Sequence, residues 1–274
     1  MERADHGGVL RRTASSGRRP LAGLVASAAV VALVFFFLES RGPVQLQAVD
    51  TTFEYSLAEG SETDFEALDI EALADRLQSL GPPRGEATVV LREHNGDGRT
   101  RAGIDIFLDD GGYAYGSSLD SLLHSDGPDR TWPAATAQTL EALETAAASG
   151  PDSRFERFSA ALGSEEADRR GGRPGAIAWS RIVSALPAAA GWEARVGAVG
   201  VLVDLDDVET TGVSTADGET LIVASFSGAD GSERLVLSAA TGLPIRYERL
   251  RADGTLDSAV SYGIQRATRE EVFG

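Results

Sequence analysis

Residues 217–264 read DGETLIVASFSGADGSERLVLSAATGLPIRYERLRADGTLDSAVSYGI, and this stretch decides the fold. Four turn dipeptides divide it, and their glycines are 13, 11 and 12 residues apart. Short apolar segments lie between the turns, at 221–224, 235–237, 245–248 and 256–264. Such even spacing of strands and turns is typical of an antiparallel meander. The alternation predicts one face against the core and one solvated face.

The same alternation names four candidate ligand-lining residues. Val260 and Tyr262 point to one face of the last strand, and Leu221 and Val223 share one face of an earlier strand. If the sheet is curved and both faces line one hollow, these side chains form an apolar ligand site. If the hollow is filled, they are core residues. Both alternatives stay open.

The sequence before the meander alternates between helix and strand patterns. A capping-box pattern with Thr63 as N-cap predicts a helix over about 65–80, and Gly81-Pro82-Pro83 ends it. The turn Asn95–Gly98 predicts a hairpin between strands at 87–91 and 104–108. Helical spacing of apolar residues predicts the remaining helices, and a further strand is expected near 112–115. The helices are expected at 134–148, 155–162 and 179–186. The fold class is therefore α+β, with a curved C-terminal antiparallel meander covered by helices.

An uncharged run at residues 21–38 predicts a membrane anchor. Eighteen residues at the helical rise span about 27 Å, close to the ~30 Å hydrocarbon core of a bilayer. Four arginines stand just before the run and acidic residues follow it, so the N-terminus is expected in the cytoplasm. The rival is a cleaved signal peptide. The run exceeds the usual ~7–15-residue signal core and ends in Phe35–Glu39, which favours a retained anchor.

This topology divides the chain into four parts. Residues 1–20 form a cytoplasmic basic tail, 21–38 a transmembrane helix, 39–62 a stalk with a short strand near 52–55, and 63–274 an extracytoplasmic α+β domain. The expected localisation is the cell membrane, as a single-pass protein. The membrane is a partner through residues 21–38.

The charge and cysteine content exclude several functions. The net charge is −17, although the first twenty residues carry +3. So acidic a domain repels nucleic acid. With no cysteine in the chain, a disulfide framework, thiol catalysis and thiolate metal sites are excluded.

No motif indicates catalysis or a metal site, and we predict no enzyme activity, cofactor or metal. The three histidines, His6, His94 and His124, are far apart in sequence, and no Gly-x-Ser-x-Gly motif supplies a nucleophile. The segment Asp204–Glu209 is acidic and is interpreted as a solvated strand or loop rather than a cation site. A calcium loop at 95–98 fails because Arg99 and Arg101 occupy ligand positions.

Large aromatic side chains offer a second set of pocket candidates. Trp179 lies on a helical apolar stripe and is expected in the core. Tyr113, Tyr115, Trp132 and Trp192 fit either a ligand concavity or the core.

Several segments of the C-terminal half resemble known families. They are Ala176–Leu202, Glu233–Leu237, Thr241–Ile245 and Val260–Tyr262. Together they resemble a family of actinobacterial membrane-anchored proteins of unknown function, often encoded beside sigma factors. The strand, Thr-Gly turn, strand ending is similar to the curved half-barrel sheet of lipoprotein-carrier proteins and of a periplasmic anti-sigma-factor regulator. The resemblance covers roughly 175–273 and implies no catalytic residues.

These observations lead to one functional expectation with two alternatives. We expect a membrane-anchored extracytoplasmic binding or sensory module, in envelope regulation or the carriage of an apolar ligand. The partner is then an apolar ligand or a protein. The alternatives are a structural or protein-interaction ectodomain and, less favoured, a carboxylate-dependent hydrolase.

Overall fold

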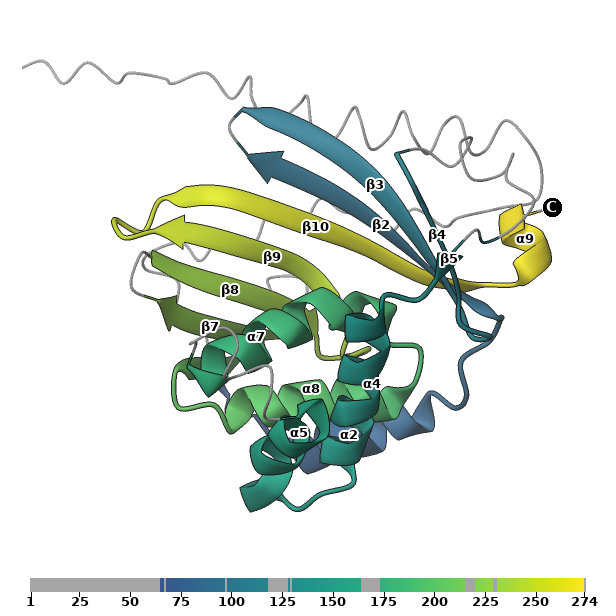
Figure 1. Cartoon of the computed structure of the whole chain (residues 1–274). Coiled ribbons are helices and arrows are strands. Elements are labelled where there is room, and N and C mark those ends of the chain that lie inside the picture. Colours follow the sequence, from purple (N-terminus) through teal and green to yellow (C-terminus); the bar gives the residue numbers. More distant parts are fainter. Residues whose placement is uncertain are drawn as a thin grey trace, which may run out of the picture.

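The computed structural model shows a large curved antiparallel sheet with helices packed against one side (Figure 1). It describes residues 65–66, 68–96, 98–117, 128, 130–163, 173–214, 220–228 and 231–273. The predicted anchor at 21–38, the stalk at 39–62 and the strand near 52–55 lie outside these residues. Within the described part, no helix has the length and apolarity needed to cross a membrane.

All ten strands of the described sheet pair antiparallel, in the order β1-β6-β7-β8-β9-β10-β2-β3-β4-β5. The strands are β1 (Phe65–Glu66), β2 (Ala87–Gly96), β3 (Arg99–Leu108), β4 (Gly112–Gly116), β5 (Arg130–Thr131), β6 (Val208–Ser214), β7 (Thr220–Gly228), β8 (Gly231–Ser238), β9 (Pro244–Arg251) and β10 (Leu256–Ala267). The meander runs from β6 to β10. Strand β10 then pairs along its length with β2, so the predicted hairpin continues the same sheet.

The strands predicted within the described residues are confirmed, but the predicted solvated face of the meander is interrupted at β7. In β7, Leu221, Ile222, Val223 and Ala224 are all buried. The even-numbered pair packs in the large core against the helices, whereas the odd-numbered pair belongs to a smaller apolar cluster on the other face. A strand that is buried on both faces has a continuous run of apolar residues, and residues 221–224 form such a run.

With one exception, the described helices cover the concave face of the sheet (Figure 1). They are α2 (Ile70–Ser79), α4 (Ala134–Ala147), α5 (Arg154–Leu162), α7 (Pro174–Ala185), α8 (Trp192–Val203) and α9 (Arg269–Phe273), with short 3₁₀ turns η1 (Pro151–Ser153) and η2 (Leu186–Ala188). The three helices predicted in the middle region correspond to α4, α5 and α7. The short helix α9 instead packs with the opposite face of β2 and β3 through Val272.

Helix α8 is the centre of the helical layer, and the sequence patterns did not predict it. It contacts α2, α4, α5 and η2 as well as the start of β6. The approach to α4 is so close that a Cβ on Gly197 would lie 1.9 Å from the carbonyl oxygen of Leu143. Only glycine permits two helix backbones to come this near.

One further prediction needs correction. Helix α2 begins at Ile70, with the Asp69 side chain accepting a hydrogen bond from the Ala72 backbone N–H, so Thr63 is not its cap. Two residues at 65–66 pair with β6 instead. The acidic segment 204–209 is a solvated loop that leads into a strand, in agreement with the interpretation from the sequence: Asp204 ends α8 and β6 starts at Val208.

Candidate ligand pocket

The four residues proposed from alternation do not line one hollow. Val260 and Tyr262 face the helices and pack against the large core. Leu221 and Val223 are buried in the smaller cluster on the opposite face of the sheet. The two pairs are therefore separated by the thickness of the sheet, and the ligand site must be sought elsewhere.

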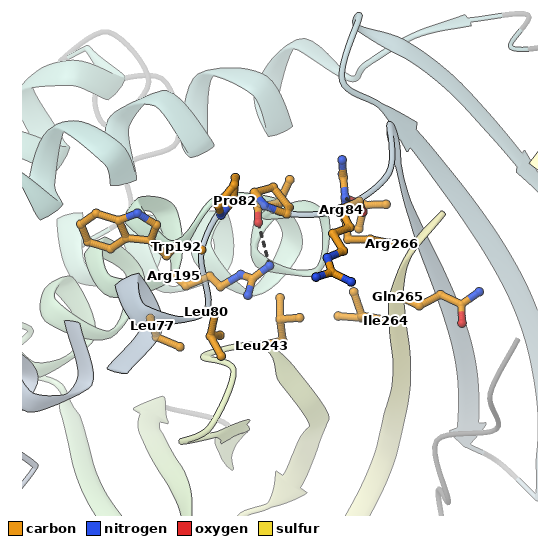
Figure 2. Close-up of a pocket in the computed structure, with 14 residues that line it drawn as sticks. Leu77, Leu80, Pro82, Arg84, Trp192, Arg195, Leu243, Ile264, Gln265 and Arg266 are labelled. Carbon is orange, nitrogen blue, oxygen red and sulfur yellow. Dashed lines mark hydrogen bonds between the residues drawn. The ribbon is translucent and has the colours of Figure 1, made fainter. Parts of the chain in front are cut away.

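A cavity of about 370 Å³ opens where α2, α8 and β10 meet (Figure 2). This volume lies in the lower part of the ~300–1,000 Å³ range of small-molecule sites. We call it the arginine pocket. It is lined by Leu77, Leu80, Gly81, Pro82, Pro83, Arg84, Thr88, Ala190, Trp192, Arg195, Leu243, Ile264, Gln265 and Arg266. Every charged residue in this lining is an arginine.

One wall is the connection from α2 to β2. Gly81 has φ +73°, a left-handed conformation that ends α2 and turns the chain toward Pro82 and Pro83. Gly85 has φ +86° and lies so close to β10 that a Cβ there would sit 2.5 Å from the Ala267 carbonyl oxygen. The connection is thereby held over the end of the sheet, with its prolines and Arg84 exposed at the pocket mouth.

Arg266 of β10 fastens this wall. Its terminal nitrogens donate to both carboxylate oxygens of Asp109, at 2.9 and 2.6 Å. They also donate to the Gly85 carbonyl at 2.6 Å and to the hydroxyl of the buried Thr88 at 2.8 Å, and Nε points to the Arg84 carbonyl at 3.4 Å. All five N–H groups of Arg266 are engaged, and Asp109 balances its charge.

Arg195 of α8 is held differently. It donates to three backbone carbonyls, those of Ala189 at 3.1 Å, Ala190 at 2.7 Å and Thr241 at 3.1 Å. These bonds tie η2 and the β8–β9 turn to α8. Burial lowers the pKa of Arg195, and the like charge of Arg266 lowers it further. Figure 2 shows the two guanidinium groups pointing toward each other across the pocket.

The apolar part of the pocket comes from separated segments. Leu77 is fully buried, whereas Trp192, Leu243 and Ile264 are only partly buried and leave apolar surface toward the cavity. The turn that carries Leu243 is shaped by Gly242, with φ +67°. A side chain there would meet Leu77 at 2.9 Å and Arg195 at 3.0 Å, so the glycine lets the turn close against both.

A second polar group lies on the helix-facing side of the sheet, away from this pocket. Asp105 is buried and receives Arg92 Nε and the Tyr113 hydroxyl, each at 2.6 Å. Trp179 Nε1 donates to Glu233. Burial raises the pKa of Tyr113, with the Asp105 bond adding to it, and burial raises the pKa of Tyr262 to about 12. The two carboxylate oxygens of Asp105 are already bound, one by the Tyr113 hydroxyl and the other by Arg92.

The remaining candidates are dispersed. His94 is exposed beside the β2–β3 turn, and His6 and His124 lie outside the described residues. Within the described ranges, no group of three or more histidine, aspartate or glutamate side chains could hold a metal ion. Asp206, Asp207 and Glu209 are exposed.

The aromatic candidates divide between core and pocket. Trp179 is 2% exposed and stacks on Phe226, as predicted for a core residue. Tyr113 and Trp132 pack around Phe107, while Tyr115 is exposed under Arg130. Only Trp192 of this set lines the arginine pocket. Arg195 was missed, and its one sequence signal is a charge within the otherwise apolar stretch 194–202.

Comparisons with known proteins give little to add to this geometry. No protein-family model matches the sequence, and no curated protein matches it. A solved structure, the crystal structure of MucB in complex with MucA(peri), is similar at 13% sequence identity with a TM-score of 0.30. The match covers 74% of this chain and 58% of that chain.

Proposed function

We propose that this chain is a membrane-anchored extracytoplasmic binding module, and that the arginine pocket receives the apolar part of a small organic ligand. One observation carries the proposal. Apolar side chains from α2, α8, the β8–β9 turn and β10 converge on a cavity of about 370 Å³ and leave it unfilled. The hollow is open to solvent on one side and has the volume of a small-molecule site, and its apolar walls favour a binding role.

The walls support this reading because they are fixed by directed bonds rather than by apolar contact alone. Arg266 holds the connection 81–86 on one side, and Arg195 holds the β8–β9 turn on the other. A pocket that is largely formed before the ligand arrives loses little free energy to ordering on binding.

A neutral apolar fluorophore tests the proposal. N-phenylnaphthylamine should bind the protein saturably, near one equivalent, with a blue-shifted emission. Replacing Ala190, which lines the pocket, by Trp should abolish this signal, because the larger side chain fills the cavity. Ala160→Trp, at an exposed position of α5, is the matched control and should bind as the parent does. No saturable binding by the parent, or equal binding by Ala190→Trp, contradicts the proposal.

The anchored, extracytoplasmic location rests on residues 21–38 and their arginine flank. The full-length chain should therefore sediment with membranes and resist extraction by high salt. N-terminal sequencing of that fraction should find the start of the chain, whereas a mature N-terminus between residues 40 and 60 would show a cleaved signal instead. If the ectodomain also binds no ligand, a protein-interaction role becomes the better assignment.

A further inference from the structure

We infer that the ligand of the arginine pocket is an organic anion, with a carboxylate or phosphate head beside Arg195 and an apolar tail against Trp192 and Leu243. The inference rests on the proposed function and specifies the class of ligand. It starts from a contrast in charge. The chain carries 42 acidic against 25 basic residues, yet the charged groups lining this pocket are three arginines.

The three arginines are not equivalent. Arg266 is neutralised by the two-oxygen contact with Asp109 and has no N–H left to offer. Its role is structural, because it holds the connection 81–86 against β10. The attraction for an anion must come from the other two.

Arg195 is a pocket residue whose positive charge has no carboxylate partner among the described residues. Its three bonds go to neutral carbonyls, and among the described residues no carboxylate lies within ion-pair distance of it. Among the described residues, one N–H on each terminal nitrogen of Arg195 has no hydrogen-bond acceptor. Arg195 is half-buried, so water solvates its charge only in part, and a bound anion would supply the counter-ion that it lacks.

Arg84 completes the arrangement at the mouth. It is exposed on the connection that forms the pocket wall, and its side chain makes no ion pair with any described residue. An anionic head entering between the connection and Leu243 would pass Arg84 and reach Arg195, while its tail would meet Trp192, Leu243 and Ile264. Charge-assisted bonds to guanidinium are stronger than neutral ones, which makes the head group decisive for affinity.

Four ligands with the same ten-carbon tail provide the test: decanoate, decyl phosphate, decanol and decylamine. Each is titrated against bound N-phenylnaphthylamine at neutral pH. The anions should displace the fluorophore at concentrations about tenfold or more below those of decanol, and decylamine should be the weakest. The ratio of decanoate to decyl phosphate then tells whether the site prefers a planar or a tetrahedral head.

Variants separate the site from bulk electrostatics. R195Q also loses the bonds that hold the wall, so binding of both ligands should weaken, and the readout is the ratio of decanol to decanoate concentration at half displacement. That ratio should fall to about one in R195Q, and R195K should keep part of it. R99Q, an equal charge change on the exposed β2–β3 hairpin, should keep all of it. The Arg84 side chain makes no hydrogen bond or ion pair with a described residue, so R84Q should fold. It should lower the preference for decanoate over decanol, and the difference from the parent should shrink as the salt concentration rises.

The outcomes distinguish the two proposals. If decanol competes as well as decanoate, the anion inference fails and the binding module stands. If the fluorophore does not bind at all, the proposed function fails as well. Should R195Q fail to fold, R84Q decides, because an unchanged anion preference in that variant overturns the inference.

Discussion

The close approach of α8 and α4 makes Gly197→Ala the sharpest test of the fold that positions the pocket. An added Cβ would lie 1.9 Å from the carbonyl oxygen of Leu143 and 2.7 Å from its carbon. Both are backbone atoms of α4, so no side-chain rotation relieves the clash. The two helices must move apart.

Two opposing terms set the magnitude. In a helix interior, Gly→Ala stabilises by about 0.5–1 kcal/mol because the unfolded chain loses freedom. Overpacking a tight core costs about 1–3 kcal/mol, and a rigid backbone neighbour places this site at the upper end. We expect a net loss of about 2 kcal/mol in the free energy of unfolding. The displaced α8 carries Trp192 and Arg195, so fluorophore affinity should fall too.

Gly200→Ala provides the matched control on the same helix. Its Cβ would meet the side chain of Arg154, at 2.5 Å from Cδ, rather than any backbone atom of another helix. Arg154 is buried, but a side chain can shift about its own torsions where a helix backbone cannot, so we expect a smaller loss of about 1 kcal/mol. Urea unfolding followed by circular dichroism and tryptophan fluorescence measures both variants. The reasoning is refuted if Gly197→Ala is as stable as the parent, or less destabilising than Gly200→Ala.

The sequence predicts the strands well because their signals are local. Turn glycines and alternating apolar segments mark β7 to β10, and the turn at 95–98 marks the β2–β3 hairpin. The joining of these two groups is not local. Residues 258–267 pair with 87–96, more than 150 positions away, and no pattern in either segment specifies that partner.

Register explains why the four candidate lining residues were grouped together. Shifting a strand by one residue exchanges its two faces. Alternation within a strand does not show how its two faces correspond to those of another strand, because the pairing register decides that. Val223 pairs with Val236, Val236 with Arg246 and Arg246 with Ser261, so Val223 shares a face with Ser261 and lies opposite Val260 and Tyr262.

Helix α8 was missed for a different reason. Amphipathic periodicity identifies a helix by the contrast between its faces. From Ala194 to Leu202 every residue except Arg195 is buried, so the segment has no polar face to reveal the period. Because the pocket is built on this helix, sequence patterns could not predict the pocket, although Trp192 was named as a candidate lining residue.

Two further predictions concern the buried Tyr262 and the pocket wall. Burial raises the pKa of Tyr262 from 10.0 to about 12, which means that the folded state favours the neutral hydroxyl. The stability it supplies is present below pH 10 and is lost as the pH rises toward 12, and Tyr262→Phe should reduce that loss by up to about 2–3 kcal/mol in urea titrations at alkaline pH. Arg266→Met should lower the free energy of unfolding by about 2–4 kcal/mol, because Thr88 and the Gly85 carbonyl lose their donor along with the Asp109 pair. The same variant frees the connection 81–86, so fluorophore affinity should fall even in conditions where the protein stays folded. Arg269→Met, which breaks an exposed pair with Asp110, is the control, and an equal effect from it would show that the wall does not depend on Arg266.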